Sequence, residues 1–526
     1  MGTGELQLVQ RGGQDIYLTG VPKINSTDEL PTDDYRTFGD PRISHFKSVY
    51  RQTTPFGMEY ISLYFYSIPS LTPLQETKAS CKIDRNGDLV HDMYLVYDLP
   101  AIFTNNQVPF SWVEEVGTKI IKEISIRLDG NVLDTQRGDF IKIYTDLTLP
   151  DDQKRKFIRC VGGESYMYNT GQNLQDDITQ QNIAIPARRL YIPLQFWFCK
   201  NSGLSIPLVA LQNNELWIDV TFSPLNELIR IGYPLISPKR MFGDYENSEL
   251  NILIRDYLLS IGYDYTNVFY YFTQNNWQSN TYLLANYIYL GEDEQKIFAY
   301  KTHEYLVQQT QFLLFQGLKA GPNHLETTFF HPSKEIFWVL TRDDLDLSND
   351  WYNFTALDDS ESLKYYQSQL PFYGFSNFYE PELLYIKNNF TTFINSIKDQ
   401  NVNKLPPQVL QTYFNNYYQI MQSAKPIFNN HDRMELQEAA FYQNLTPFKY
   451  HNGTGGQGIY VLPFSLNPEL HQPSGTQNMS VLDNQEIFIE IFNTFPPEQK
   501  FNCYMWCVSY NIFRIIGGIG QMAFAS

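Results

Sequence analysis

The chain has 526 residues, and 16% of them are aromatic while only 18% are charged. This composition excludes an intrinsically disordered protein, because disordered chains are highly charged and hold few aromatic residues. The formal net charge of −18 at pH 7 argues against nucleic-acid binding, since a surface that binds phosphates needs a basic face. All-β domains reach about 250 residues, so two large all-β domains fit the length better than one.

Residues 1–25 lack the long apolar core of a secretion signal, and we interpret them as an N-terminal arm. Strand signals fill about residues 43–225, within a first predicted all-β domain of residues 26–225. Ile124, Ile126 and Leu128 alternate with polar residues, and an Asp-Gly turn signal follows them. The segment Leu216–Phe222 shows the same alternation. Both patterns predict half-buried strands.

One basic cluster, Lys154–Arg159, lies inside this first domain. Two acidic residues, Asp151 and Asp152, precede it. We therefore expect a solvated loop at this point and not a patch for nucleic acid.

A less periodic stretch with two prolines covers residues 226–249, and we predict it to be the inter-domain linker. Strand signals resume and continue to the C-terminus, so residues 250–526 form the second predicted all-β domain. In one of its strands Ile487, Ile489 and Ile491 alternate with residues that are also largely apolar. This pattern predicts a strand that is buried on both sides.

Residues of about 341–425 carry many acidic and amide side chains, and we predict a surface insertion there. Its apolar residues between Pro406 and Ala424 recur at helical spacing, and two prolines suit the first turn of a helix. Long insertions lie on the surface and often carry a variable function.

Two fragments resemble ligand-binding loops. The segment Gly453–Gly458 matches the glycine pattern of a dinucleotide site, but a strand-like segment follows it where a helix is needed, so we expect a flexible loop. The segment Asp344–Asp350 resembles the start of a calcium loop, but Asn349 stands where glycine is needed and Thr355 where glutamate is needed. We expect a solvated acidic loop, and no cofactor or metal is predicted.

The five cysteines are odd in number and spread along the chain. A secreted disulfide framework is denser and usually even. We therefore predict buried free thiols and assembly in a reducing compartment.

Several segments resemble the major capsid proteins of the nucleocytoplasmic large DNA viruses. In the first half these are Leu6–Gly20, Ile43–Phe56 and Leu190–Leu216, the last holding a Phe-Trp-Phe segment and a proline-flanked strand. In the second half they include Tyr287–Gln311 and His331–Leu340. The most specific piece is Phe464–Asn484 with its HQPSGT core, and Tyr510–Ser526 is similar to the usual ending of the family. The likeness fails between about residues 350 and 426.

The resemblance implies an all-β protein of two tandem eight-stranded jelly rolls, with the insertion in the second. It also implies a homotrimer with a pseudo-hexagonal outline that tiles an icosahedral shell in the virion. Minor capsid and penton proteins are the implied partners, and the N-terminal region is expected to face an internal membrane. Assembly is expected in the cytoplasm of the host cell, at a virus factory, without direct contact with nucleic acid and without catalysis.

The residues that carry the family motifs have predicted structural roles. The Phe-Trp-Phe cluster is expected in the core or in a subunit contact, and the HQPSGT segment is expected to form a tight turn. Asn511 and Arg514 interrupt the most apolar segment near the C-terminus, which therefore predicts a buried strand and not a membrane span. The full set is Phe196, Trp197, Phe198, Pro207, His471, Gln472, Pro473, Ser474, Gly475, Thr476, Asn511 and Arg514.

Two alternatives remain open from the sequence. A carbohydrate-binding or carbohydrate-active protein can share the jelly-roll fold, because fold does not fix function. Such a protein should show a cleft with aromatic platforms and paired carboxylates. A viral spike or penton component is the other alternative, and it usually has one jelly roll instead of two.

Overall fold

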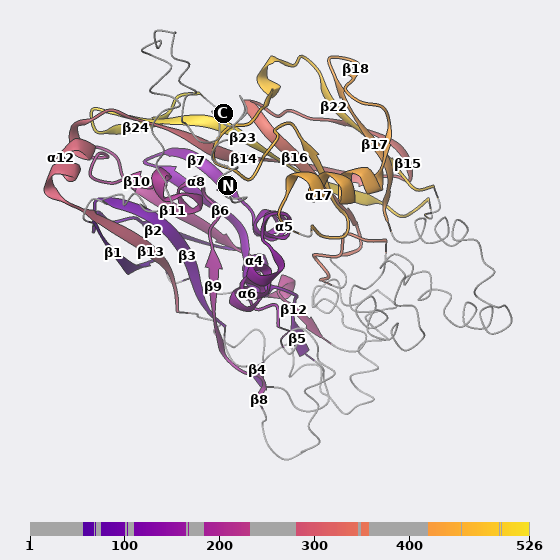
Figure 1. Ribbon diagram of the computed structural model, residues 1–526. Helices are drawn as coiled ribbons and strands as arrows, with labels where there is room; N and C mark the ends of the chain where they lie inside the picture. The colour runs from indigo at the N-terminus through magenta and orange to yellow at the C-terminus, as the bar shows by residue number, and fades with distance from the viewer. Residues whose placement is uncertain are drawn as a thin grey trace, which may run out of the picture. The chain divides into compact units, whose positions relative to one another are not determined.

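The structure is a computed structural model (Figure 1). It describes residues 56–67, 69, 75–99, 102–103, 110–164, 167, 183–231, 280–345, 349–356, 419–453, 455–493, 495 and 497–524. The predicted N-terminal arm and most of the predicted linker and insertion lie outside these residues. The predicted helix of the insertion does too, apart from its last residues.

The first jelly roll is built from two antiparallel sheets. Its strands occur along the chain in the order that gives the jelly-roll pairing, in which the last strand lies between the first and the third. One sheet holds β1 (Phe56–Tyr64), β13 (Thr281–Leu290), β3 (Leu89–Leu99), β9 (Arg188–Pro193) and the short β10 (Ile206–Pro207). The other holds β2 (Thr77–Lys82), β11 (Leu216–Phe222), β6 (Ile121–Leu128) and β7 (Asn131–Gln136).

The second jelly roll repeats this order. One sheet runs β14 (His303–Leu318), β23 (Phe501–Ile516), β16 (Pro332–Arg342) and β20 (Ile459–Pro463), and β21 (Gln477–Asn478) and β24 (Ile519–Met522) pair onto it. The other runs β15 (Gly321–Glu326), β22 (Gln485–Ile491), β17 (Met421–Phe428) and β18 (His431–Asp432), with β19 (Gln437–Glu438) beside β17. The predicted fold of two jelly rolls is confirmed.

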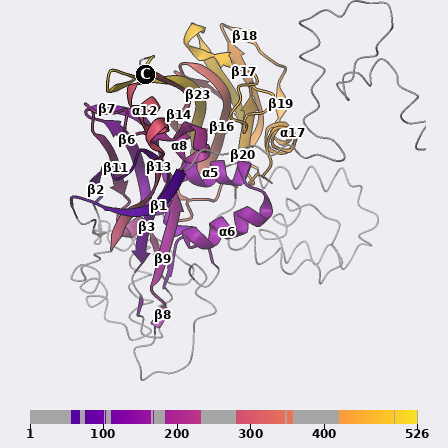
Figure 2. The same cartoon turned by 60° about the vertical axis from the view of Figure 1, so that its left-hand side comes forward.

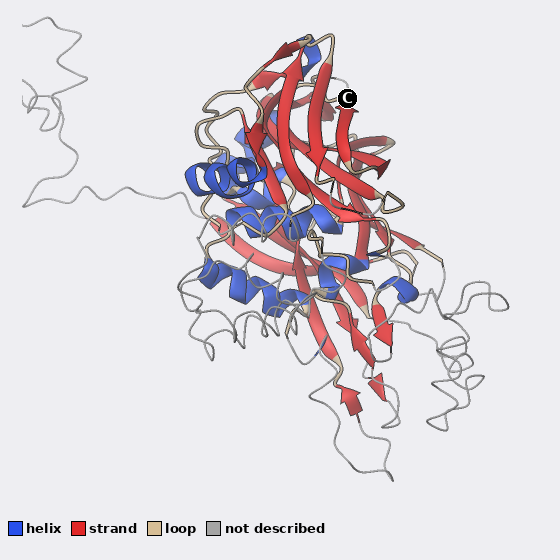
Figure 3. Ribbon diagram, turned by 90° about the vertical axis from the view of Figure 1, so that its right-hand side faces the viewer, coloured by secondary structure: helices blue, strands red, loops and turns tan. Residues whose placement is uncertain are grey.

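Short helices and ribbons connect the strands, and Figure 3 shows the helices in blue beside the red sheets. The helices are α4 (Val116–Ile120), α5 (Gly138–Thr148), α6 (Asp151–Val161), α8 (Trp197–Lys200), α12 (Glu292–Tyr300) and α17 (Thr446–Tyr450), with the π-helical turn η7 (Phe441–Leu445) and the 3₁₀ turns η2 (Ser202–Leu204), η3 (Leu225–Glu227) and η8 (Met479–Val481). The ribbons pair β4 (Ile102–Phe103) with β8 (Ile183–Ile185), and β5 (Phe110–Trp112) with β12 (Ile229–Ile231).

The strands predicted from alternation are present. In β6 and β11 the apolar positions named above are buried, and their neighbours are more exposed. In β22 the isoleucines are buried, but the opposite face is only half-buried, so the prediction of burial on both sides was wrong. The ring of Phe488 lies on that face beside His324 and Lys425, whose polar ends reach solvent.

The predicted inter-domain linker at residues 226–249 needs a correction. Strand β13, which we assigned to the second domain, pairs with β3 along residues 281–288 and completes the first jelly roll. The first domain therefore continues to Leu290, and α12 connects the two jelly rolls. The described start of the predicted linker is also ordered, because η3 and β12 occupy it.

Two local predictions were also wrong. The basic cluster at residues 154–159 lies in helix α6, where Asp151 and Asp152 form the first turn and are favourable at the positive end of the helix dipole. The last residues of the predicted insertion helix, from Met421 onward, belong to strand β17. Their side chains alternate between the core and the surface because β17 pairs with β22.

Candidate functional site

The sheet of β14, β23, β16 and β20 is apolar on both faces. In β16, Ile336 and Trp338 point into the core of the second jelly roll, while Phe337 belongs to a cluster shared with the first jelly roll. In β23, Met505 points into the core of the second jelly roll, and Trp506 belongs to the shared cluster. This sheet is therefore covered on both sides within one chain.

Helix α5 of the first jelly roll covers the outer face of that sheet. The ring of Phe140 stacks on Phe337 with 5.9 Å between centroids, and Phe337 stacks on Trp506 at 5.7 Å. Tyr144, one turn along the same helix, also contacts Phe337. Figure 2 shows α5 between the strands of the two jelly rolls. The contact fixes the two jelly rolls of one chain to each other.

Polar contacts continue this interface at the edge where β7 meets β14. Gln309 Nε2 donates to the Leu133 carbonyl at 2.6 Å, and the Thr310 amide donates to Asp134 Oδ1 at 2.9 Å. Burial raises the pKa of Asp134 to about 7, although the hydrogen bonds that it accepts from the Thr310 amide and from Gln136 oppose the rise. Asp134 therefore keeps a proton in the native protein at pH values where the unfolded chain has lost it.

We expect Asp134→Asn to change how stability depends on pH. The pKa of Asp134 is 3.8 unfolded and about 7 folded, so its contribution is complete below the unfolded value and is lost as the pH rises through the folded one. The wild type should thus lose more stability than the variant between about pH 5 and pH 8, because asparagine has no proton to lose. Urea midpoints at the two pH values measure this, and equal losses in both proteins would contradict the assignment.

The glycine-rich segment is a packed contact and not the predicted flexible loop. The Gly453 amide donates to the Leu147 carbonyl of α5 at 2.8 Å, and the Gly455 amide donates to the Asp146 carbonyl at 3.1 Å. A Cβ at position 453 would collide with the backbone oxygens of both α5 residues. The following strand, β20, was predicted correctly. Glycine is needed here because two backbones approach closely.

We expect Gly453→Ala to destabilise the protein by about 1–3 kcal/mol, the usual range for overpacking a filled contact. Gly130→Ala is the matched control, because a Cβ at position 130 meets nothing within 4 Å. Thermal unfolding of both variants checks this. If Gly453→Ala destabilises the protein no more than Gly130→Ala does, the two backbones can move apart to accommodate the added Cβ, and the prediction is wrong.

A buried ion cluster lies in the same interface. Lys334 and Glu335 are both almost inaccessible, and their side chains lie 3.7 Å apart. Lys334 Nζ donates to Gln308 Oε1 at 3.1 Å and to the Pro468 carbonyl at 2.6 Å. Glu335 Oε2 lies 3.2 Å from His451 Nε2. Each charge therefore has a partner that offsets part of its desolvation.

The pKa values in this cluster follow from burial and from neighbouring charges. Burial alone would lower the pKa of His451, but Glu335 and Glu469 raise it to about 9. Burial alone would raise the pKa of Glu335, but His451, Lys334 and Lys200 bring it below its ordinary value. Lys200 is an exposed residue, but its ammonium lies 4.0 Å from the Tyr144 ring, where desolvation and the charge of Lys334 lower its pKa. The pair of His451 and Glu335 is therefore ionised at neutral pH.

A second buried ion pair joins the jelly rolls near the predicted acidic loop. Arg230 Nη2 donates to Asp350 Oδ1 at 2.7 Å, and both side chains are buried. Asn349 donates to the carbonyls of Asn226 and Ile229. The prediction of a solvated loop was therefore wrong at Asp350. Residues 346–348 lie outside the described structure.

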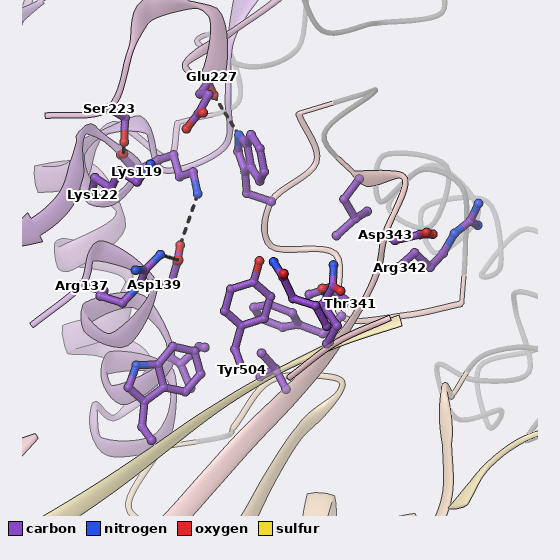
Figure 4. Close-up of a pocket in the computed structure, with 18 of the residues that line it drawn as sticks. Lys119, Lys122, Arg137, Asp139, Ser223, Glu227, Thr341, Arg342, Asp343 and Tyr504 are labelled. Atoms are coloured by element: carbon purple, nitrogen blue, oxygen red, sulfur yellow. Dashed lines mark hydrogen bonds and ion pairs between the residues drawn. The ribbon is translucent and has the colours of Figure 1, made fainter. Parts of the chain in front are cut away.

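A cavity of about 400 Å³ lies between the jelly rolls (Figure 4). Trp351 Nε1 donates to the Glu227 carbonyl at 2.8 Å, and Lys119 Nζ lies 4.0 Å from the Trp351 ring. Asp139 lies 3.5 Å from Lys119 and 3.9 Å from Arg137. These charged and aromatic groups are engaged with one another, and the geometry favours a structural role for the cleft.

The Phe-Trp-Phe cluster is buried at the start of α8. Phe196 and Phe198 stack with centroids 5.7 Å apart, and Trp197 contacts Phe513 of the second jelly roll at 6.2 Å. Pro207 lies in β10 and pairs with Leu89 of β3. The Phe-Trp-Phe cluster therefore lies at the contact between the jelly rolls. The HQPSGT segment is far from it in the sequence.

The HQPSGT segment lies between β20 and β21 and is largely exposed. Ser474 Oγ accepts a hydrogen bond from the Asn467 amide at 2.9 Å, and the Ser474 carbonyl accepts one from Leu466. Gly475 has a φ of 127°, which a side chain would disfavour. His471 and Ser474 are half-buried, whereas Gln472, Pro473 and Thr476 face solvent.

The two polar residues of the C-terminal apolar segment lie in β23 in different surroundings. Asn511 is buried, and its amide donates to Gln309 Oε1 at 2.8 Å and to the Phe524 carbonyl at 3.0 Å. Arg514 lies nearer the surface, with its Nε 2.8 Å from Glu304 Oε1. The predicted strand is confirmed. Among the described residues, no helix combines the length and apolarity needed to span a membrane.

The described cysteines are all free thiols, and Cys81, Cys503 and Cys507 are buried. Cys199 is half-buried and Cys160 is exposed, so the prediction of burial does not extend to Cys160. Within the described part of the chain, no group of three or more His, Cys, Asp or Glu side chains has the arrangement of a metal site.

Two jelly rolls joined by an aromatic contact define a protein of the double jelly-roll class. Residues 44–291 match the model of the major capsid protein N-terminus, and residues 294–521 match that of the large eukaryotic DNA virus major capsid protein. The chain therefore belongs to the major capsid protein family of the large eukaryotic DNA viruses. The border between the two models coincides with the end of β13.

Known proteins agree with this assignment over the whole length. The major capsid protein of Phaeocystis pouchetii virus is 26% identical, with 100% of both chains covered. Probable capsid protein 4 of Acanthamoeba polyphaga mimivirus is also 26% identical over 100% of both. Among solved structures, a chain of the PBCV-1 virus capsid has a TM-score of 0.62 and 19% identity, covering 92% of this chain and 100% of that one.

Proposed function

We propose that this major capsid protein forms a homotrimer and that the trimer is the building unit of the icosahedral shell. The observation that carries the proposal is the contact between the two jelly rolls, in which α5 and the outer face of β16 and β23 hold the pair as one unit. Three such pairs give six jelly rolls in a near-hexagonal arrangement. A unit of this kind tiles a flat facet with repeated lateral contacts.

The partners of the trimer follow from its place in a shell. Neighbouring trimers, minor capsid proteins beneath them and penton proteins at the vertices are the proposed contacts. Residues 1–25 are proposed to face the internal membrane. Assembly is proposed at a virus factory in the host cytoplasm, where reduced thiols such as Cys160 persist.

The proposed role is structural, without catalysis. In the cavity between the jelly rolls, Lys119 and Arg137 pair with Asp139, and the lining rings of Tyr504 and Trp506 stack with centroids 6.3 Å apart. A carbohydrate-active site would instead offer paired carboxylates beside an open aromatic platform. The carbohydrate-binding alternative is supported only by the general argument that one fold can serve many functions.

The copy number of the chain in purified particles tests this function. The proposal expects this protein to be the most abundant one in the shell, present in multiples of three. A few copies, confined to the vertices, would instead identify a penton or spike component. Glycan-array binding and glycoside-hydrolysis assays on the purified chain are expected to be negative, and a specific signal would support the carbohydrate alternative.

A further inference from the structure

The two jelly rolls have equivalent parts because their strands follow the same order. By position in that order, β1, β13, β3 and β9 of the first jelly roll correspond to β14, β23, β16 and β20 of the second. Helix α5 lies between β7 and β9 of the first jelly roll. The segment η7–α17 comes just before β20, the counterpart of β9, in the second jelly roll, so it is the counterpart of α5.

One of the two equivalent contacts is formed within the chain. The outer face of the second jelly roll, with Phe337 and Trp506, is covered by Phe140 and Tyr144 of α5. The pairing thus joins the helix that precedes β9 in one jelly roll to the outer sheet face of the next.

On the corresponding face of the first jelly roll, the edge strand β1 is exposed among the described residues, while Val96 of β3 on the same face is buried. Met58, Tyr60 and Tyr64 of β1 are 62%, 52% and 67% exposed. The rings of Tyr60 and Tyr94 lie 6.3 Å apart, and those of Tyr64 and Tyr282 lie 5.7 Å apart, so the tyrosines form two ring pairs on one face of the sheet. We call Met58 and these four tyrosines the tyrosine face. Tyrosine suits a surface that is wet before assembly and dry after it.

The counterpart of α5 is also uncovered. In the η7–α17 segment Leu445 is 52% exposed and Phe448 is 85% exposed. Exposed large apolar side chains that lie together mark an interaction surface. Lys449 adds a positive charge beside Phe448, while Asp92 lies on the face of β3 that carries Tyr94. Both surfaces therefore expose apolar side chains, and each carries a charge of the sign opposite to that on the other.

We infer that the tyrosine face of one subunit binds the η7–α17 segment of a second copy of this chain, with Leu445 and Phe448 packed against the tyrosines. The contact repeats between subunits the α5 contact that exists within the subunit. It is head-to-tail, so each subunit offers one surface and accepts the other, and it closes into a ring when the rotation permits. Because each chain supplies two jelly rolls, a ring of six jelly rolls closes after three chains. The inference rests on the proposed trimer and assigns its contact.

Point variants of the full-length chain test the contact. Tyr60→Asp and Phe448→Asp each place a charge in the buried centre of the interface and are expected to weaken trimer formation at least 100-fold. Each variant should then sediment at the mass of one chain, 61.5 kDa, with an unchanged circular dichroism spectrum. Tyr300→Asp is the matched control, because Tyr300 is 87% exposed on α12 and should leave the trimer intact. Trimers that survive both interface variants would overturn the inference.

A photo-crosslink identifies the occupant directly. Tyr60→p-benzoylphenylalanine is introduced into full-length protein, which is then mixed with an isotopically heavy copy and irradiated. The inference expects crosslinks from position 60 of one copy to the peptide holding Phe448 of the other. Crosslinks to residues 1–55 of the same copy would show that the chain's own N-terminal segment covers the face. If the wild type is a trimer but the variants or the crosslinks contradict this contact, only the inferred contact fails and the proposed function stands. If the wild type is a monomer, the proposed function itself is refuted.

Discussion

Glu335→Gln is expected to lower the free energy of unfolding by about 3–5 kcal/mol, the range for removing one partner of a buried ion pair. Glu335 is buried beside Lys334 and His451, and its removal leaves both cations without their nearest carboxylate. Glu469, more exposed, remains as a partner of His451 alone. Urea denaturation of the variant and the wild type under identical conditions measures the difference.

A second substitution and an exposed pair serve as controls for this result. Adding His451→Gln to Glu335→Gln removes one of the stranded cations and should recover part of the loss. Glu292→Gln breaks the exposed pair with Lys296 and should change stability very little, because solvent screens surface ion pairs. If Glu335→Gln is as mild as Glu292→Gln, the cluster does not stabilise the contact between the jelly rolls.

Phe337→Ala is expected to cost about 3–5 kcal/mol, the usual range for truncating a buried phenylalanine. Phe337 is fully buried between α5 and β23, where it contacts Phe140 and Trp506. The cavity left by the ring lies between two rigid elements, so the site cannot readily collapse. Thermal and urea unfolding measure the loss.

Tyr300→Ala is the control for Phe337→Ala, because it removes an aromatic ring from an exposed helix. Its effect should stay within about 0.5 kcal/mol, as is usual for surface substitutions. Limited proteolysis gives a second readout. Cleavage near α12, which connects the jelly rolls, should accelerate in Phe337→Ala if the two move apart, and an unchanged pattern with unchanged stability would contradict the proposed contact.

The sequence allowed the strands to be predicted but not their partners. The alternation in β11 is a local property, and it survives folding because one face of that strand meets the core. The partner of β13 is not local. This strand lies about 190 residues from β3 in the chain, and the pairing follows from jelly-roll topology, which no periodicity reveals. The domain boundary was therefore placed too early.

The contact between the jelly rolls could be predicted only in part. The uninterrupted apolar run of β16 around Phe337 suggests burial on two faces, but it does not say what covers the second face. The buried Lys334 gives no local signal, since a lysine beside a glutamate is usually exposed. Its partners Gln308 and Pro468 come from distant segments, and only the fold brings them together.

The mass of the purified full-length protein in solution tests the central claim most directly. The account predicts a particle of three times 61.5 kDa, stable on dilution because obligate contacts are large and apolar. Native mass spectrometry distinguishes this mass from the masses of one, two or four chains. A particle that remains at one or two chain masses under conditions where the protein is folded would contradict the account.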